Sequence, residues 1–465
     1  MGNNIIRDMK KQMEEKDIYE YAKECAFSYM DNVGEREVYP KKDDLELLKR
    51  FEEALPTEGC KDTEILKMLH DYGSSNTVAQ TGGRYFGFVN GGALPISLAT
   101  RWLTDVWDQN AVLHIASPIT SKLEEICEKW IVELLGLPEG TAAGFVSGSS
   151  NAALCALAAA RNTLLNRAGW DISKQGLFGA PEIKVVLSQD AHATIIKALS
   201  LLGIGYNQIV KVESDSQGRL MIDKLPSLDE KTILILQAGN VNTGAYDDFD
   251  TLCDIAQKEG AWIHIDGAFG LWAAASDNTK HLTKGISKAD SWSVDAHKTL
   301  NVPYDCGIVL CKHRDKIIAA MQARGEYILY GSKRDGMLYT SDMSRRARAV
   351  ELWAAIKYLG REGIQCLVNN LHENAVYFAK QLRKVGFQVL NDVVFNQVLV
   401  NYKDEQTTKN ILKQVQDSRI CWCGETKWHE TYAIRLSVCS WVTTKDDIDK
   451  SVSSFVDAIS NIANE

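Results

Sequence analysis

Short apolar runs that alternate with helix-like segments constrain the fold of this chain more than any other feature. Segments with amphipathic helical spacing, such as DDFDTLCDIAQKEG, separate most of the runs. Strands that are apolar on both faces are typical of a mainly parallel sheet covered by helices on each side. The sequence therefore predicts an α/β fold. The runs are KVVLS (184–188), TILILQAG (232–239), AWIHID (261–266), SWSVD (291–295) and CGIVLC (306–311).

The segments outside these runs predict three parts of the chain. Residues 1–60 are polar and helical in pattern, and we expect them to pack on the body or to wrap a partner subunit. Residues 61–345 form the expected large domain, including a helix over SKLEEICEKWIVELLGLPEG with Ser121 and Glu124 as a capping box. Residues 346–465 carry two long helical patterns followed by strand-like FNQVLVNY and YAIRLSVC, which predict a smaller C-terminal α+β domain.

Composition excludes several classes of protein. The chain is 45% hydrophobic and 24% charged with a net charge of -9, which excludes disorder and fibres. It has no block rich in lysine and arginine, so nucleic acid is not an expected partner, and Arg345, Arg346 and Arg348 are expected to be structural or near a cofactor. The chain contains no run of about 20 apolar residues, so a membrane span is not expected. The 11 scattered cysteines, with CWC the one close pair, predict reduced thiols in the cytoplasm and no metal site.

Polar residues follow several of the predicted strands. In open parallel sheets, ligands bind beyond the carboxyl ends of the strands. FVSGSSNAALCALAAAR runs from an apolar stub through a turn into a helix, and Gly148, Ser149 and Ser150 could hold a phosphate on backbone N–H groups. A serine-capped buried helix is the alternative interpretation of this stretch.

Three further residues each have a catalytic and a structural interpretation. Asp266 ends an apolar strand, where an ionised carboxylate needs a cationic partner or caps a turn. His192 could stack on a flat group or be a hydrogen-bonded core histidine. Lys298 could attack a carbonyl as a neutral amine or pair with Asp295 or Asp305. Together with the phosphate turn, the three residues fit one ligand, pyridoxal 5′-phosphate.

The order of these motifs resembles the group II pyridoxal-phosphate-dependent decarboxylases, which act on aromatic amino acids, tyrosine, histidine and glutamate. The similarity extends from RYFGFVNGG through SGSSNA, DAHAT, AGNVNTG, HIDGAFG and DAHK to RRARAVELW and AIRLSVCSWVTT. It implies the aspartate-aminotransferase fold (fold type I), with a seven-stranded mainly parallel sheet and a smaller C-terminal domain. It also implies an obligate homodimer with active sites at the subunit interface.

The resemblance assigns roles to individual residues. Lys298 would form a Schiff base with the cofactor, Asp266 would face its ring nitrogen, and His192 would stack on the ring and is a candidate for proton transfer. The remaining cofactor contacts that the resemblance implies are Gly148, Ser149, Ser150, His297, Asn240 and Ala268.

The substrate pocket departs from that of animal relatives. Val89, Asn90 and His114 replace aromatic residues there, and Thr299 replaces a tryptophan. Tyr327, Tyr330 and Tyr339 lie in the stretch after the lysine, and none occupies the position of the loop tyrosine thought to supply a proton. The candidate pocket residues are Phe88, Asn90, His114, Tyr330 and Tyr339.

The expected activity is decarboxylation of an L-amino acid to its amine and CO2. An aromatic or bulky hydrophobic substrate is expected first, and aspartate or glutamate next. An oxygen-dependent aldehyde synthase and a carbon–carbon lyase are alternatives on the same site. A non-catalytic regulatory protein that binds pyridoxal phosphate is the alternative outside the enzymes. Arg435 in AIRLS is a further candidate for binding a carboxylate.

Overall fold

The computed structural model describes residues 2–323 and 333–464 of the chain. None of the helices in these two ranges is long and apolar enough to cross a membrane. The strands are β1 (Ala142–Val146), β2 (Lys184–Ser188), β3 (Ile209–Val212), β4 (Thr232–Gln237), β5 (Trp262–Asp266), β6 (Ser291–Asp295), β7 (Gly307–Cys311), β8 (Gln388–Val389), β9 (Gln397–Asn401), β10 (Gly424–Trp428) and β11 (Thr431–Ser437). The α-helices are α1 (Gly2–Glu15), α2 (Asp17–Asn32), α3 (Lys42–Leu47), α4 (Asp62–Met68), α5 (Pro95–Trp107), α6 (Pro118–Leu134), α7 (Ser149–Arg167), α8 (Ile172–Gln175), α9 (Ala193–Leu201), α10 (Phe249–Lys258), α11 (Arg314–Met321), α12 (Ala349–Lys384), α13 (Glu405–Ser418) and α14 (Lys445–Asn464).

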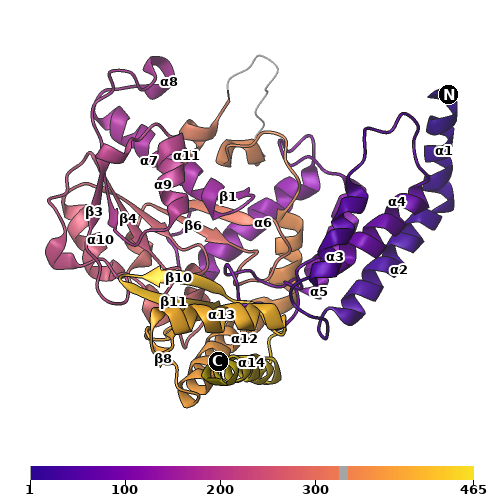
Figure 1. Cartoon of the computed structure of the whole chain (residues 1–465). Helices are drawn as coiled ribbons and strands as arrows, with labels where there is room; N and C mark the ends of the chain where they lie inside the picture. Colours follow the sequence, from indigo (N-terminus) through magenta and orange to yellow (C-terminus); the bar gives the residue numbers. More distant parts are fainter. Residues whose placement is uncertain (1, 324–332, 465) are drawn as a thin grey trace. The chain divides into compact units, whose positions relative to one another are not determined.

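The first seven strands form one mainly parallel sheet in the order β1-β7-β6-β5-β4-β2-β3 (Figure 1). The pairs from β6 to β3 are parallel, whereas β7 is antiparallel to both β6 and β1. This confirms the expected seven-stranded α/β fold, and all five predicted apolar runs are strands of this sheet.

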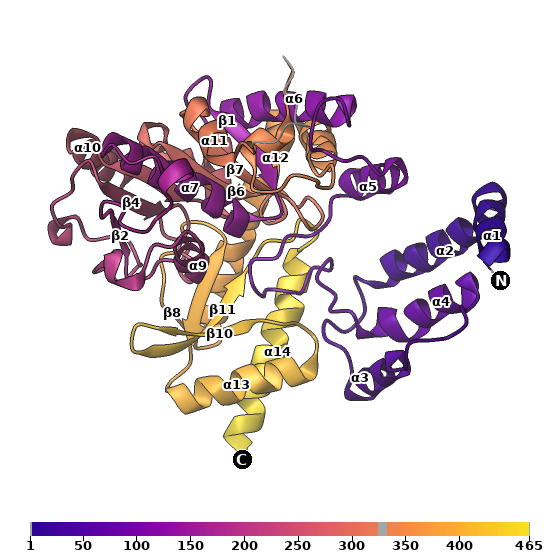
Figure 2. The ribbon, with the colours of Figure 1, turned by 90° about the horizontal axis from the view of Figure 1, so that it is seen from above.

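Alternate residues of the strands face two separate apolar cores. On β4, Ile233 and Ile235 pack with residues of α7, α9 and α11, whereas Leu234 and Leu236 pack with residues of α6, α10 and α12. The helices therefore cover both faces of the sheet (Figure 2). Because side chains alternate along a strand, a strand buried on both faces must be apolar throughout, as the sequence pattern indicated.

The expected capping box on α6 is wrong. The helix begins at Pro118, and its N-cap is Ser117, whose hydroxyl accepts a hydrogen bond from the backbone N–H of Thr120. Proline suits the first helical position because its missing N–H would have no intrahelical partner there. Ser121 and Glu124 lie inside the helix, and both are buried.

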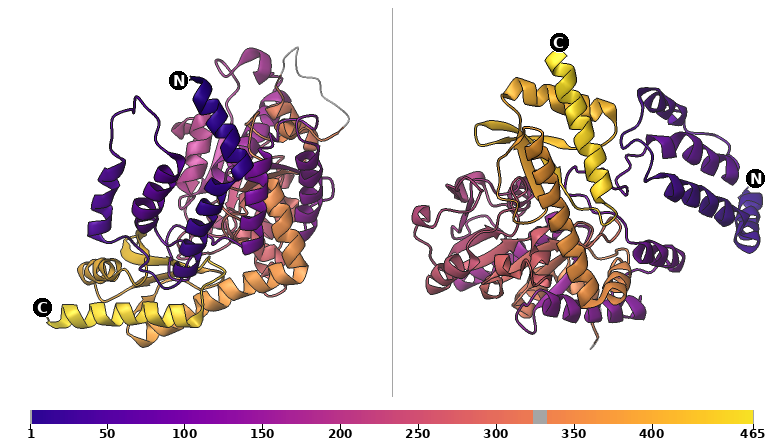
Figure 3. Two further views of the ribbon diagram at one scale, coloured as in Figure 1. Left: turned by 90° about the vertical axis from the view of Figure 1, so that its right-hand side faces the viewer. Right: turned by 90° about the horizontal axis from the view of Figure 1, so that it is seen from below.

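The two long helices predicted after residue 345 are the two parts of α12, which meet at a kink. Gly360 has φ 60 and interrupts the helical backbone, so the two straight parts meet at an angle (Figure 3, orange). Glycine adopts this left-handed conformation without a Cβ clash.

The C-terminal part of α12 leads into a second sheet, which is antiparallel throughout in the order β10-β11-β9-β8. The sequence pattern indicated β9 and β11 but missed β8, β10 and β3. These three strands contain half-buried or exposed positions and lack a continuous apolar run.

The chain divides into two compact units. One comprises Met1–Tyr85, Lys409–Cys423 and Val442–Glu465, and the other Phe86–Thr408 and Gly424–Trp441. Both sheets belong to the second unit. The expected division at residues 60 and 345 follows different boundaries and stays a prediction.

Two arginines connect the N-terminal segment of the first unit to its C-terminal segments through hydrogen bonds and ion pairs. The guanidinium of Arg84 donates to the carbonyls of Gly34 and Arg36 and lies 3.9 Å from the Asp447 carboxylate. Arg419 makes two hydrogen bonds with the Glu37 carboxylate, at 3.0 and 3.2 Å. The N-terminal helices are therefore joined to the rest of their unit through residues 34–37 and 84.

His264 on β5 makes the stability of the fold depend on pH. Its side chain is fully buried, its Nδ1 lies 3.0 Å from the Ser291 hydroxyl, and burial lowers its pKa to about 3. The unfolded chain binds a proton at this residue near pH 6.5 whereas the folded chain does not, so stability falls as pH falls below 6.5.

We expect His264→Gln to remove this dependence while keeping a hydrogen-bonding group beside Ser291. Between pH 7 and pH 5, the free energy of unfolding of the original protein should fall by about 2 kcal/mol more than that of the variant. Denaturant unfolding at the two pH values measures the difference. Equal losses in the two proteins would contradict the assignment.

Candidate active site

The predicted site residues gather at the carboxyl edge of the large sheet. Asp266 is the last residue of β5 and lies opposite Ser293 of β6 in the parallel register. Asp295 ends β6, and Lys298 follows in the turn after it. His192 precedes α9 after β2, and Gly148 lies between β1 and α7. Because these strands run in the same direction, their ends meet at one edge.

Lys298 and the start of α7 share one buried carboxylate, that of Asp295. Oδ2 of Asp295 lies 3.1 Å from Nζ of Lys298, and Oδ1 accepts a 2.5 Å hydrogen bond from the backbone N–H of Ser149. The Asp295 side chain is 2% exposed and that of Lys298 is 18% exposed. The ion pair that the sequence offered as an alternative role for Lys298 is therefore present.

His297 is buried beside this pair. Its Nδ1 accepts a hydrogen bond from the backbone N–H of Cys306, and its Nε2 lies 3.6 Å from Oδ2 of Asp295. Burial lowers the pKa of the imidazole, so the ring is neutral near pH 7 with its proton on Nε2. The ring stacks on that of Tyr304 at a centroid distance of 4.2 Å.

Asp266 is a buried carboxylate close to His192 and Lys298. Burial raises its pKa, and the electrostatic interactions with these two residues oppose the rise. Its Oδ1 accepts long hydrogen bonds from the Ala268 N–H at 3.3 Å and the Ser293 hydroxyl at 3.4 Å. A buried carboxylate of this kind is stabilised by a protonated ring nitrogen, which is the role that the sequence predicted.

His192 caps the first turn of α9. Its Nδ1 accepts a hydrogen bond from the N–H of Thr194 and lies 2.8 Å from the Thr194 hydroxyl. Burial lowers the pKa of the ring, which is therefore neutral near pH 7 with its proton on Nε2. A neutral, oriented imidazole is suited to stacking on an aromatic ring.

The turn before α7 fits a phosphate group. Gly148 is in extended conformation, and a Cβ at this position would lie 3.3 Å from Cε1 of His297. A Cβ at Gly307 would lie 2.4 Å from the Gly148 Cα, so the backbone passes tightly over the start of β7. The N–H of Ser149 already binds an anionic oxygen, and Ser150 is exposed. Anion-binding backbone groups at the start of a 19-residue helix are what a phosphate requires.

Asn240 shapes a turn. Its Oδ1 accepts hydrogen bonds from the N–H groups of Asn242 and Thr243, and its Nδ2 lies 3.5 Å from the Asp190 carbonyl. Its predicted contact with the cofactor stays a prediction.

Of the expected substrate-pocket residues, Asn90 is linked to the Lys298 region. Its Oδ1 accepts a hydrogen bond from the Tyr304 hydroxyl, and the Tyr304 ring stacks on His297. Phe88 is 64% exposed in the same segment. The structure therefore places the RYFGFVNGG motif next to the lysine turn.

The other expected pocket residues have different surroundings. Nδ1 of His114 lies 3.1 Å from the Ser121 hydroxyl on α6. The Tyr339 hydroxyl accepts a hydrogen bond from Arg314, and the Arg334 guanidinium lies 4.1 Å from the Tyr339 ring centroid. Tyr330 lies outside the described residues, as does Tyr327. The pocket roles of His114, Tyr330 and Tyr339 stay predictions.

Sequence reasoning missed two residues that hold the lysine turn. Asn301 has φ 55, and its Oδ1 accepts hydrogen bonds from the N–H groups of Gly92 and Trp441. Its Nδ2 donates to the carbonyls of Thr299 and Cys439. Gly91 is also required, because a Cβ there would lie 2.1 Å from the Lys298 carbonyl oxygen. An asparagine inside the apolar TLNVP stretch was the feature of the sequence that could have indicated this structural role.

The three clustered arginines each pair with an acid. Arg345 lies 2.7 Å from Glu124, Arg346 pairs with Glu351, and Arg348 lies 3.3 Å from Asp305. The structural role expected for these arginines accounts for their positions.

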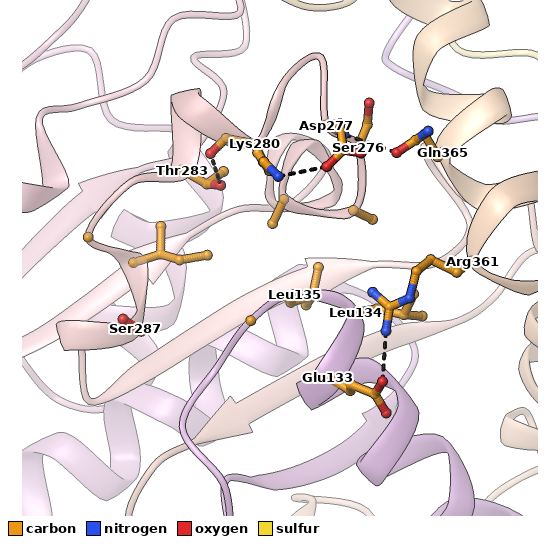
Figure 4. A pocket seen from close by; sticks show the side chains of 15 residues that line it. Glu133, Leu134, Leu135, Ser276, Asp277, Lys280, Thr283, Ser287, Arg361 and Gln365 are labelled. Carbon is orange, nitrogen blue, oxygen red and sulfur yellow. Dashed lines mark hydrogen bonds and ion pairs between the residues drawn. The ribbon is translucent and has the colours of Figure 1, made fainter.

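A cavity of about 390 Å³ lies elsewhere in the second unit (Figure 4). Its lining includes Gly136, which precedes β1, and Ser287, which precedes β6, so it adjoins the amino ends of these strands. The Arg361–Glu133 and Lys280–Asp277 ion pairs lie at its wall. None of the predicted site residues lines this cavity.

Comparisons with known proteins identify the family of this chain. The model of the pyridoxal-dependent decarboxylase conserved domain matches residues 46–403. An aromatic-L-amino-acid decarboxylase of Bacillus atrophaeus is 24% identical over 92% of each chain. An aspartate 1-decarboxylase of Aliivibrio fischeri is 34% identical over 52% of this chain and 47% of its own length. An acidic amino acid decarboxylase of Mus musculus is 28% identical over 74% of this chain and 64% of its own length.

Solved structures share the fold. A structure of Oryza sativa TDC with PLP and tryptamine aligns with a TM-score of 0.89 at 18% identity, covering 97% of this chain and 98% of the other. A structure of mouse CSAD aligns with a TM-score of 0.87 at 20% identity, covering 96% of this chain and 98% of the other. The matched family model, together with the half-buried lysine and the buried carboxylate at the sheet edge, leads to one conclusion. This chain belongs to the pyridoxal-dependent decarboxylase family and is a carboxy-lyase that uses pyridoxal 5′-phosphate.

Proposed function

We propose that the enzyme removes the α-carboxyl group of an L-amino acid at the site around Lys298, giving the amine and CO2. The observation that carries the proposal is the grouping of Lys298, Asp266 and the start of α7 at one edge of the sheet. When bound, the cofactor supplies an electron sink for the electron pair that departing CO2 leaves behind. In this proposal, the turn at Ser149 binds the phosphate, Asp266 holds the proton of the ring nitrogen, and His192 orients the ring.

Lys298 is expected to form the Schiff base with the cofactor. Borohydride reduction followed by peptide mass spectrometry should place the pyridoxyl group on Lys298. Lys298→Ala should lose the label, and its rate of CO2 release should fall roughly 10³-fold or more because both attachment and proton transfer at this amine are lost. Lys312→Ala, at the other end of β7, is the matched control and should keep both. A label that persists in Lys298→Ala would contradict the assignment.

For the substrate side chain, we propose an acidic one. Burial is the main cause of the lowered pKa of His192, and the charge of Arg435 on β11 contributes to it, so this guanidinium lies near the site. Burial lowers the pKa of Arg435 itself, and no acid counteracts this effect among the causes of its shift. A buried cation is stabilised by a carboxylate from the substrate.

The α-carboxylate is a poor partner for this arginine. It loses its charge as CO2 forms, so an ion pair with it would stabilise the ground state more than the transition state. A side-chain carboxylate keeps its charge throughout the reaction. Sequence similarity to an aspartate 1-decarboxylase and to acidic amino acid decarboxylases supports this order of preference, which reverses the order expected from the sequence.

An aromatic substrate is the second candidate. Phe88 is 64% exposed and Tyr304 is 45% exposed, and both belong to segments that contact the lysine turn. Their rings offer an apolar surface to a flat side chain. The similarity to an aromatic-L-amino-acid decarboxylase over 92% of the chain supports this candidate.

A panel of L-amino acids, with products identified by mass spectrometry, separates the candidates. We expect kcat/KM to be highest for aspartate or glutamate, and Arg435→Met to lower it roughly 100-fold or more because a buried charge pair is lost. Arg219→Met removes an exposed arginine paired with Asp215 and is the control, with an unchanged value expected. Turnover of aromatic amino acids that is insensitive to Arg435→Met would favour the second candidate. Aldehyde with hydrogen peroxide would identify an aldehyde synthase.

We also propose that the enzyme is a homodimer. Exposed apolar side chains gather on α5 and the loop after it, where Leu103 is 55%, Val106 79%, Trp107 45% and Ile115 87% exposed. Apolar exposure of this extent on one helix is typical of an interface. On α1, Ile5, Ile6, Met9 and Met13 lie at helical spacing and are each at least half exposed. We infer that the N-terminal segment contributes to the same dimer.

We expect Val106→Asp to dissociate the dimer, because an aspartate there would be buried without a partner. Sedimentation velocity at micromolar concentration should show a dimer for the original protein and a monomer for the variant. Leu201→Asp, at a 68% exposed apolar position on α9, should remain dimeric. A monomeric original protein would overturn the proposal.

A further inference from the structure

Asp295 binds both groups that the cofactor is expected to bind. Its Oδ1 accepts the hydrogen bond of the Ser149 N–H, the leading phosphate donor, at 2.5 Å. Its Oδ2 lies 3.1 Å from Nζ of Lys298, the amine that is expected to attach to the aldehyde. One carboxylate therefore spans the two ends of the expected cofactor site. This inference rests on the proposed roles of Ser149 and Lys298.

The backbone holds Asp295 in this position. Its N–H donates to the Ala268 carbonyl at 2.8 Å, and its carbonyl accepts a 2.8 Å hydrogen bond from Nε1 of Trp272. Asp295 is 1% exposed and Trp272 is fully buried. The carboxylate can therefore leave its two partners only by side-chain rotation, within a site that offers it little water.

The first contact opposes binding of a phosphate. The N–H groups at the start of α7 attract an anion, and Asp295 already supplies one there. A phosphate at the same N–H would lie close to the carboxylate, and two anions at such separation repel one another strongly inside a protein. The phosphate must therefore displace the carboxylate oxygen or bind beside it at a cost in affinity.

The second contact opposes attachment of the lysine. With the cofactor bound, Lys298 would have to react with its aldehyde group as a neutral amine, with the aldehyde oxygen leaving as water. The ammonium proton must pass to solvent before the attack. The 3.1 Å ion pair with the Asp295 carboxylate must be broken before this attack can take place.

We propose that Asp295 is a positioning residue that lowers the affinity of the enzyme for its cofactor. Its carboxylate competes with the phosphate for the Ser149 N–H and with the aldehyde for Lys298, which it holds in an ion pair. The enzyme consequently exchanges its cofactor with the surrounding pool, and its activity follows the cofactor concentration. The neutral rings of His192 and His297 leave this carboxylate with Lys298 as its main cationic partner.

The Asp295→Asn variant removes the negative charge of the side chain and keeps its hydrogen bond to the turn before α7. The amide oxygen can still accept the Ser149 N–H bond, so the fold of the turn is kept while the negative charge is lost. Asp290→Asn is the matched control, because Asp290 directly precedes β6 at the opposite end and its carboxylate binds the N–H of Ile263. Asp295→Ser is a second variant, which also removes the charge and retains a hydroxyl oxygen.

The experiment measures affinities of the purified protein after removal of its cofactor. Pyridoxal phosphate, pyridoxal and inorganic phosphate are titrated separately, followed by absorbance for the first two and by calorimetry for the third. We expect Asp295→Asn to lower the Kd for pyridoxal phosphate about tenfold or more. The Kd for inorganic phosphate should fall as well, and Asp290→Asn should leave all three values unchanged.

Pyridoxal separates the two contacts because it has the aldehyde but no phosphate. A tighter attachment of pyridoxal in Asp295→Asn supports the effect on Lys298, and a tighter binding of inorganic phosphate supports the effect at Ser149. An unchanged or higher Kd for pyridoxal phosphate in both variants would overturn the proposal. These titrations do not require turnover, so an inactive panel of amino acids would contradict the proposed reaction and leave this result standing.

Discussion

The parallel pairing of β5 with β6 determines where the charged groups of this enzyme lie. The register sets Asp266 opposite Ser293, two residues before Asp295. Both carboxylates therefore emerge at the same edge of the sheet, one from each strand. Lys298 follows in the next turn, so a cation and two acids meet at one largely buried edge of the sheet. Every other part of the site is arranged around this group of charges.

Burial decides which of these groups are charged. It lowers the pKa values of His192 and His297, so both imidazoles are neutral near pH 7. The other ionisable side chains of the site are those of Asp266, Asp295, Lys298 and Arg435. Asp295 is paired with Lys298 directly, whereas Asp266 and Arg435 have no equally short ion pair among the described contacts. A ring nitrogen and a substrate carboxylate are the natural partners for these two, which connects the cofactor to the proposed substrate class.

Segments that are distant in the chain complete the site. The Phe86 carbonyl accepts a hydrogen bond from the N–H of Ser437, which joins the RYFGFVNGG motif to β11. Asn301 then joins Gly92 and Trp441 to the lysine turn through its single amide group. In the order of the chain, α12 follows the last strand of the large sheet and precedes the first strand of the small sheet. The small sheet carries Arg435. Loss of the Asn301 amide would leave several buried backbone groups without partners.

The sequence alone determined the fold class and the chemical groups of the site. Continuous apolar runs separated by helices specify a parallel sheet, because a strand with helices on both faces cannot alternate with polar residues. Lysine, aspartate, histidine and a small-residue turn at strand ends then specify a cofactor with an aldehyde, a ring nitrogen and a phosphate. Local periodicity was insufficient for the short strands β8 and β10, which lack a continuous apolar run.

Only the tertiary structure decided how these groups contact one another. The Asp295 carboxylate was one of two possible partners for Lys298 in the sequence, and its simultaneous bond to Ser149 became evident only when β6 and α7 were brought together. Asn240 shared the pattern of a cofactor contact, yet its oxygen is used by the turn that follows it. Residue type and spacing along the chain determine which functional groups can take part in the site. Hydrogen bonds and ion pairs across the sheet edge depend on distances between segments more than 100 residues apart, as between Ser149 and Asp295, which no local pattern records.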